Sequence, residues 1–194
     1  MSSTKIRPKL IIRKFTEDAV AGYIEKLDDI EFSYPADQEV LIQIDSYGGA
    51  VYGLFMLIDK LKSMPQPIVT YCSSKAMSAG VFLLAIAGNK GLRFASEDAS
   101  MLVHEAKVGA VGDMKDVEDS LVHAKDLNDR LLDKFAKAIG LKNSKQIREM
   151  IKKRAEGHDL IITAEEAKKL GIIDEVASIS IQPHKRWNII KLNK

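Results

Sequence analysis

Short apolar runs alternate with amphipathic segments along most of the chain. Positions 40–44 and 68–72 are mostly apolar and predict strands buried in a parallel sheet. Each run is followed by small or glycine-rich residues, then by apolar positions at helical spacing, which predicts helices over 51–63 and 81–87. Strand, turn and helix repeated in this order indicate βαβ units and therefore an α/β fold.

The second half of the chain is dominated by one long amphipathic segment. Apolar residues recur at helical spacing from 113 to 139, which predicts a single helix. These residues occupy more than one stripe, which a lone solvated helix does not need. We therefore expect Leu121, Leu131 and Phe135 to be buried, partly by a neighbouring subunit.

The remaining elements are shorter and are marked by capping signals. Asn143 with Ser144 predicts the start of a helix, and Thr163 followed by Glu166 is a capping box. Short strands are predicted at 10–15, 91–95, 100–104, 160–162 and 172–179, with a small-residue turn at 73–80 and a loop at 105–112.

Composition and charge exclude several classes of protein. The chain has 194 residues, enough for one domain with a substantial core, and its net charge of +2 gives no argument for a nucleic-acid partner. Cys72 is the only cysteine, so a disulfide framework and a cysteine zinc site are both excluded. The most apolar stretch, 79–88, is shorter than the ~20 residues that span a membrane. The basic N-terminus lacks the apolar run of a signal peptide. We expect a soluble, cytoplasmic protein.

Two predicted turns contain residues that could take part in catalysis or ligand binding. Gly48-Gly49 and Ser78 each follow a predicted buried strand and precede a helix, and parallel sheets bind ligands at the ends of such strands. A Gly-Gly turn lets the backbone approach a ligand closely and direct an N–H group at it. A serine at a helix N-terminus is accessible, and the helix end favours developing negative charge.

Each candidate residue also has a purely structural interpretation. The glycines fit an ordinary tight turn, Ser78 a helix N-cap, His104 a buried histidine at a strand end, and Asp159 a loop or strand-edge residue. A serine nucleophile needs a base, and the base needs an orienting carboxylate. Spacing along the chain does not show that these side chains meet.

Four segments resemble one known family, the proteolytic subunit of the Clp protease. Residues 40–49 (VLIQIDSYGG) resemble its strand and Gly-Gly turn, and 74–88 (SKAMSAGVFLLAIAG) are similar to its nucleophile segment. Residues 101–104 (MLVH) match its histidine segment, and 159–176 resemble the segment that opens with its aspartate. The resemblance extends over about residues 10–178, and the order Ser, His, Asp is also that of the family.

The resemblance implies a role for five residues. Ser78 would be the nucleophile, His104 the general base, and Asp159 the residue that orients the imidazole. The backbone N–H groups of Gly49 and Ala79 would form the oxyanion hole. The family requires neither a metal nor another cofactor for peptide hydrolysis.

The resemblance also implies an architecture and an assembly. The fold would be the crotonase-like spiral of βαβ units with a protruding long helix, the handle, at 113–139. Residues 1–9 would be a loose arm, 10–178 the peptidase domain and 179–194 a basic tail. Family members form heptameric rings, often stacked as tetradecamers, which enclose a chamber for peptides and unfolded proteins. An AAA+ unfoldase would supply the substrates. The nearly balanced charge and the short apolar stretches lead us to expect neither nucleic acid nor membrane as a partner.

Some positions depart from the family pattern. Tyr47 replaces a proline before the glycines, Ala79 replaces a methionine, Glu105-Ala106 replaces Gln-Pro, and His158 replaces an arginine before the aspartate. The axial-pore loops that meet the unfoldase are expected to be missing or reduced. Short members of the family also occur in phage and prophage contexts.

Three other functions are compatible with parts of the sequence. A crotonase-like acyl-CoA enzyme would share the oxyanion hole but use carboxylates in place of Ser78. A signal-peptide-peptidase type would pair Ser78 with a lysine, for which Lys75 is badly spaced. An inactive structural subunit of a mixed ring would need no working triad.

Trp187 in the basic tail is expected to pack against its own or an adjacent subunit, because a disordered tail has no need of the chain's only tryptophan.

Overall fold

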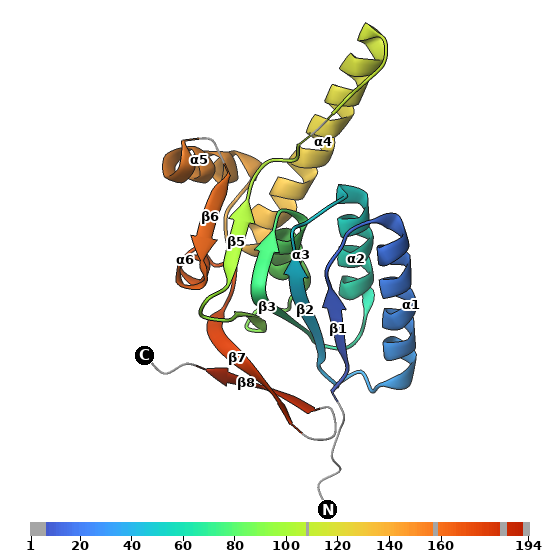
Figure 1. Ribbon diagram of the computed structural model, residues 1–194, viewed down its shortest axis with the longest axis vertical. Helices are drawn as coiled ribbons and strands as arrows, with labels where there is room; N and C mark the ends of the chain where they lie inside the picture. Colours follow the sequence, from blue (N-terminus) through green and yellow to red (C-terminus); the bar gives the residue numbers. More distant parts are fainter. Residues whose placement is uncertain (1–6, 108, 157–158, 183–185, 192–194) are drawn as a thin grey trace, which may run out of the picture.

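A mainly parallel sheet forms the centre of the molecule, with helices packed along it (Figure 1). The computed structural model describes residues 7–107, 109–156, 159–182 and 186–191. Strands β1, β2, β3, β4 and β7 pair in parallel in that order, and β8 pairs antiparallel with β7. The strands are β1 (Lys9–Ile12), β2 (Val40–Ser46), β3 (Ile68–Met77), β4 (Arg93–Ala95), β5 (Ser100–Val103), β6 (Leu160–Thr163), β7 (Glu175–Gln182) and β8 (Arg186–Lys191).

Six helices complete the described part of the chain and confirm the predicted α/β class. The predicted caps are present: the side chain of Asn143 accepts a hydrogen bond from the N–H of Gln146, and Thr163 and Glu166 form a capping box. The helices are α1 (Glu17–Ser33), α2 (Val51–Ser63), α3 (Ala79–Ala87), α4 (Met114–Ala138), α5 (Ser144–Ala155) and α6 (Ala164–Lys169). None of the helices in this part of the chain combines the length and the apolar character needed to cross a membrane.

Strand β3 changes neighbours half-way along its length. Its first half pairs with β4, and its second half, Lys75–Met77, pairs in parallel with β5. The sequence predicted a strand ending at Cys72 and a turn over 73–80, which is wrong, because pairing with a strand some 25 residues later keeps these small residues extended. This fork carries the end of β3 away from β4 and places it beside the end of β5.

The two faces of the sheet bury different apolar clusters. Val40, Ile42 and Ile44 point into the main core with the helices, whereas Leu41 points into a second cluster, as the two-residue period of a strand requires. Trp187 of β8 is 1% exposed in that second cluster. Of the two predicted alternatives, packing against its own or against an adjacent subunit, the structure shows the first. The other buried members are Val69, Tyr71, Phe94 and Ala177.

Helix α4 rises from the body of the molecule along much of its length (Figure 1). Its C-terminal half is anchored: Leu131 and Phe135 are buried as predicted, and the ring of Phe135 packs edge-on against Phe82 of α3, with 4.9 Å between centroids. Its N-terminal half projects, and Leu121 is 51% exposed in the single chain. Burial of Leu121 by a neighbouring subunit stays a prediction.

Candidate active site

Ser78 sits at a sharp turn between β3 and α3. It is one of two non-glycine residues with positive φ in the described chain, at φ 53° and ψ −121°. Such a conformation costs about 1–3 kcal/mol and persists only where its surroundings enforce it. Here the Ser78 N–H donates to the carbonyl of Leu102 at 3.0 Å, and its carbonyl accepts from the N–H of Val81 at 3.1 Å. A strained serine between strand and helix is the arrangement that presents a nucleophilic hydroxyl to solvent.

The pairing of β3 with β5 brings His104 to this serine. Met77 and Leu102 are register partners, so the chain leaves β5 beside the turn that holds Ser78. Nε2 of His104 lies 2.7 Å from Oγ of Ser78, within hydrogen-bond distance. The structure therefore brings together two predicted site residues that the sequence alone could not connect.

The pairing of β5 with β6 brings Asp159 to the other side of the imidazole. Val103 and Leu160 are antiparallel partners, so His104 follows one strand where Asp159 precedes the other. Oδ1 of Asp159 lies 3.4 Å from Nδ1 of His104, longer than an ordinary hydrogen bond. This nitrogen is buried and has no hydrogen-bond partner within the described chain. The carboxylate therefore faces the imidazole, but at this distance it forms no ordinary hydrogen bond with it. His158, the departure noted beside it in the sequence, lies outside the described residues.

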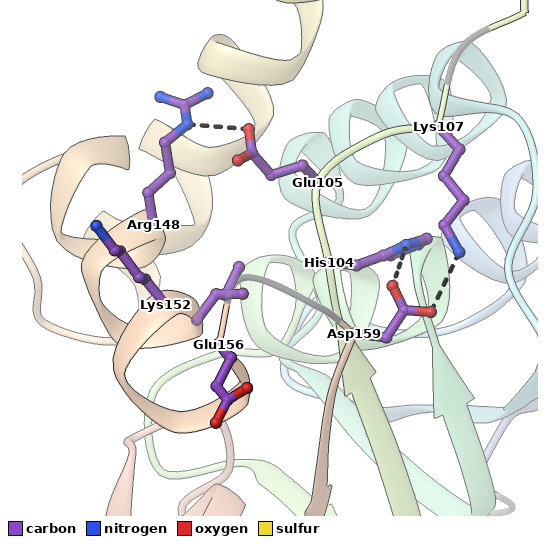
Figure 2. A pocket seen from close by; sticks show the side chains of 8 residues that line it. His104, Glu105, Lys107, Arg148, Lys152, Glu156 and Asp159 are labelled. Atoms are coloured by element: carbon purple, nitrogen blue, oxygen red, sulfur yellow. Dashed lines mark hydrogen bonds and ion pairs between the residues drawn. The ribbon is translucent and has the colours of Figure 1, made fainter.

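Lys107 holds the second oxygen of the same carboxylate. Its Nζ lies 3.1 Å from Oδ2 of Asp159 (Figure 2). This hydrogen bond is the largest cause that lowers the pKa of Asp159 below its ordinary value, so the carboxylate is ionised at neutral pH. Burial is the largest cause that lowers the pKa of His104; the charge of Lys107 acts in the same direction, and Asp159 opposes both. The imidazole is therefore neutral, as a general base must be, down to a pH below its usual range.

The Gly-Gly turn packs directly against the serine. Gly48 has φ 101°, and a Cβ atom built on it would lie 2.7 Å from Cβ of Ser78 and 2.9 Å from the carbonyl oxygen of Met77. Gly49 has φ 148° and forms a parallel bridge with Phe15. Only glycine allows this approach. Gly49 and Ala79, the predicted oxyanion donors, thus belong to the two turns that meet at Ser78.

A cavity of about 450 Å³ opens beside His104 and Asp159. Its lining is largely charged (Figure 2). One wall is fixed by a network in which Glu105 accepts from Arg148 at 2.9 Å and from the side chain of Asn128 at 2.8 Å. The remaining lining residues are Lys107, Ile151, Lys152 and Glu156.

Three of these contributors were missed from the sequence. Lys107 lies in a Gly- and Ala-rich segment where a lone lysine indicates a solvated loop, and it meets Asp159 across 52 positions. Asn128 and Arg148 lie on helices whose polar faces predict exposure. Of the residues in this network, only Glu105 stood out in the sequence, because it departs from the family pattern.

Lys75 is not placed to serve as the base. Its Nζ lies 2.7 Å from Oδ1 of Asp45 and 4.7 Å from the ring centroid of Tyr47. The hydrogen bond to Asp45 is the main cause that raises the pKa of Lys75, so its amine stays protonated. A Ser–Lys dyad is therefore disfavoured. No cluster of three or more His, Cys, Asp or Glu side chains suited to a metal ion occurs among the described residues.

Comparison with known proteins identifies the family. The family model described as Clp protease matches residues 10–180. The chain belongs to the Clp protease family. The predicted membership of this family is thereby confirmed.

Two curated relatives of this Clp protease family member carry consistent names. The chain is 33% identical over 140 residues to the ATP-dependent Clp protease proteolytic subunit of Deinococcus radiodurans, covering 72% of this chain and 65% of that protein. It is 31% identical over 166 residues to the ATP-dependent Clp protease proteolytic subunit 1 of Chlamydia caviae, covering 83% of this chain and 81% of that protein. The match thus spans slightly less than two thirds of the Deinococcus protein.

Proposed function

We propose that this chain is a serine endopeptidase in which Ser78, His104 and Asp159 act as nucleophile, base and orienting carboxylate. The observation that carries the proposal is the 2.7 Å contact between Ser78 Oγ and His104 Nε2 at a strained strand–helix turn. Family membership supports the reaction class, and the contact supports the roles assigned to Ser78 and His104.

The proposed reaction proceeds in two stages. Ser78 Oγ attacks the scissile carbonyl carbon while its proton passes to Nε2 of His104. The oxyanion that forms accepts hydrogen bonds from the N–H groups of Gly49 and Ala79, each such donor being worth roughly 10²–10³ in rate. The imidazolium then gives its proton to the leaving amine, and the C–N bond breaks to leave an acyl-serine. Water, deprotonated by the same imidazole, attacks the ester and restores the serine.

Asp159 is assigned to orientation and charge rather than to proton transfer. Its carboxylate faces Nδ1, so it favours the tautomer whose Nε2 accepts the serine proton. The charged cavity beside His104 is where we place part of the substrate chain.

The proposal includes a cytoplasmic homo-oligomer, a heptameric ring or a stacked pair of rings, that encloses the active sites. It is supported by apolar side chains left exposed around the projecting half of α4, namely Met114, Leu121 and Val122. Peptides and unfolded proteins are the proposed substrates, delivered by an AAA+ unfoldase. The names of the two relatives, which are called ATP-dependent, support that partner.

Hydrolysis of a fluorogenic peptide tests the proposal, with Ser78→Ala as the matched control. The wild-type protein, brought to the oligomeric state found by native mass spectrometry, should cleave the peptide, and the variant should not. Equal activity in both would remove Ser78 from the reaction. A wild-type oligomer without activity would favour the inactive structural subunit.

A further inference from the structure

The carboxylate of Asp159 is shared between two cationic or potentially cationic groups. Oδ1 lies 3.4 Å from Nδ1 of His104, and Oδ2 lies 3.1 Å from Nζ of Lys107. The two contacts use different oxygens, so the lysine fixes the plane of the carboxylate with the other oxygen directed at the imidazole. Figure 2 shows Lys107 and His104 on the same side of Asp159.

This arrangement matters because Asp159 is otherwise poorly held. Its side chain is 42% exposed, and among the described residues its contacts are His104 and Lys107. A carboxylate that is open to water can rotate and become solvated, and it then no longer aligns the imidazole. The side chain of Lys107 is 73% exposed, so the pair adds little to the stability of the fold. The ion pair instead affects the orientation of the Asp159 carboxylate and the charge near His104.

Lys107 also places a positive charge near the base. Protonation of His104 during the reaction must occur against that charge, while Asp159 acts in the opposite direction. Glu105 and Arg148, which also line the cavity, are paired with each other. The other charged residues that line the cavity are Lys152 and Glu156.

We infer that Lys107 is a positioning residue of this site: it holds Asp159 in line with His104. Its positive charge also opposes protonation of the imidazole, in addition to the larger effect of burial. The inference rests on the proposed peptidase function, since it assigns Lys107 a role through His104 and Asp159. Lys107 touches neither Ser78 nor the oxyanion donors in the described contacts, so it is not itself a catalytic residue.

The test is the pH profile of peptide hydrolysis by Lys107→Met, measured on the intact oligomer. Removing the charge should move the acid limb of kcat/KM to higher pH by about half a unit, the size expected for one screened charge near the imidazole. Loss of the carboxylate anchor should lower kcat on the plateau on the order of tenfold, less than the ~10²-fold cost of a 1 Å misplacement. An unshifted acid limb, or a plateau kcat at or above wild type, would overturn the inference.

Two further variants separate this role from a general effect of charge. Lys107→Arg keeps a cation that can reach Asp159, so its acid limb and plateau should stay near wild type. Lys26→Met removes an exposed lysine of α1 and should move neither quantity. If the acid limb of kcat/KM in Lys107→Arg were shifted as far as in Lys107→Met, that result would also overturn the inference.

Labelling with a fluorophosphonate distinguishes failure of the inference from failure of the proposed function. Wild-type protein that labels at Ser78 and cleaves peptide, alongside a Lys107→Met variant with an unchanged profile, would overturn the inference alone. Wild-type protein that neither labels nor cleaves would overturn both.

Discussion

The hydroxyl oxygen of Ser78 lies 2.7 Å from Nε2 of His104, although 26 positions separate the two residues. The contact follows from register: the end of β3 pairs with β5, and the N–H of Ser78 donates to the carbonyl of Leu102. The pairing of β3 with β5 thus brings the proposed nucleophile and its base next to each other.

Ser78→Ala and His104→Ala are each expected to lose peptide hydrolysis by on the order of 10⁴-fold or more, with the fold retained. Because the two residues act as one unit in the proposed mechanism, the double variant should be hardly worse than either single variant. Steady-state rates and circular dichroism of the three proteins provide the measurement. Losses that add up in the double variant would mean that the residues work independently.

Gly48→Ala should abolish most activity, because its new Cβ would lie 2.7 Å from Cβ of Ser78. Displacing the nucleophile by about 1 Å is expected to cost roughly 10²-fold in kcat/KM. Gly91→Ala is the matched control: its φ of 86° imposes similar backbone strain, but nothing lies within 4 Å of the new Cβ. If Gly48→Ala were as active as Gly91→Ala, the close packing of the Gly48 turn against the Ser78 turn would be contradicted.

Trp187 should emit as a buried indole that iodide does not quench, because it is 1% exposed within the second apolar cluster. Trp187→Ala should lower the free energy of unfolding by about 3–5 kcal/mol, the usual cost of emptying a large buried aromatic site. Denaturant titration measures that loss. Emission like that of free indole in water, readily quenched, would show instead that β8 is detached in solution.

Local patterns in the sequence predicted most elements, but not the contacts between them. Periodicity predicted α4 within one residue at each end, because its apolar stripe is a local property. The extension of β3 to Met77 depended on pairing with β5, which no local pattern of small residues reveals. The same pairing brings His104 to Ser78, so the site could be named residue by residue only through its resemblance to a family. Lys107 had neither a periodic nor a family signal.

Asp174→Asn should destabilise the fold by about 3 kcal/mol, because it leaves the buried guanidinium of Arg93 without its charge partner. Burial raises the pKa of Asp174, but its hydrogen bonds with Arg93 and Gly91 outweigh this and lower it overall. A carboxyl with a lowered folded-state pKa stabilises the fold above its unfolded pKa, about 3.9, and the contribution fades as pH falls through the folded value.

The difference between wild type and Asp174→Asn should therefore be constant near neutral pH and shrink below about pH 4. Urea titrations at a series of pH values provide the measurement. Asp119→Asn, on the projecting part of α4, serves as a control without a buried partner. A difference that grows as the pH falls would have the wrong sign for this ion pair.

The most direct test of the account is to map the adduct that a fluorophosphonate forms with the assembled protein. The reagent phosphonylates a serine hydroxyl only where a neighbouring base activates it. The account predicts one adduct per chain, located by peptide mass spectrometry on Ser78, absent in Ser78→Ala and greatly slowed in His104→Ala. No adduct on the assembled wild-type protein, or an adduct on another serine that persists in Ser78→Ala, would contradict it.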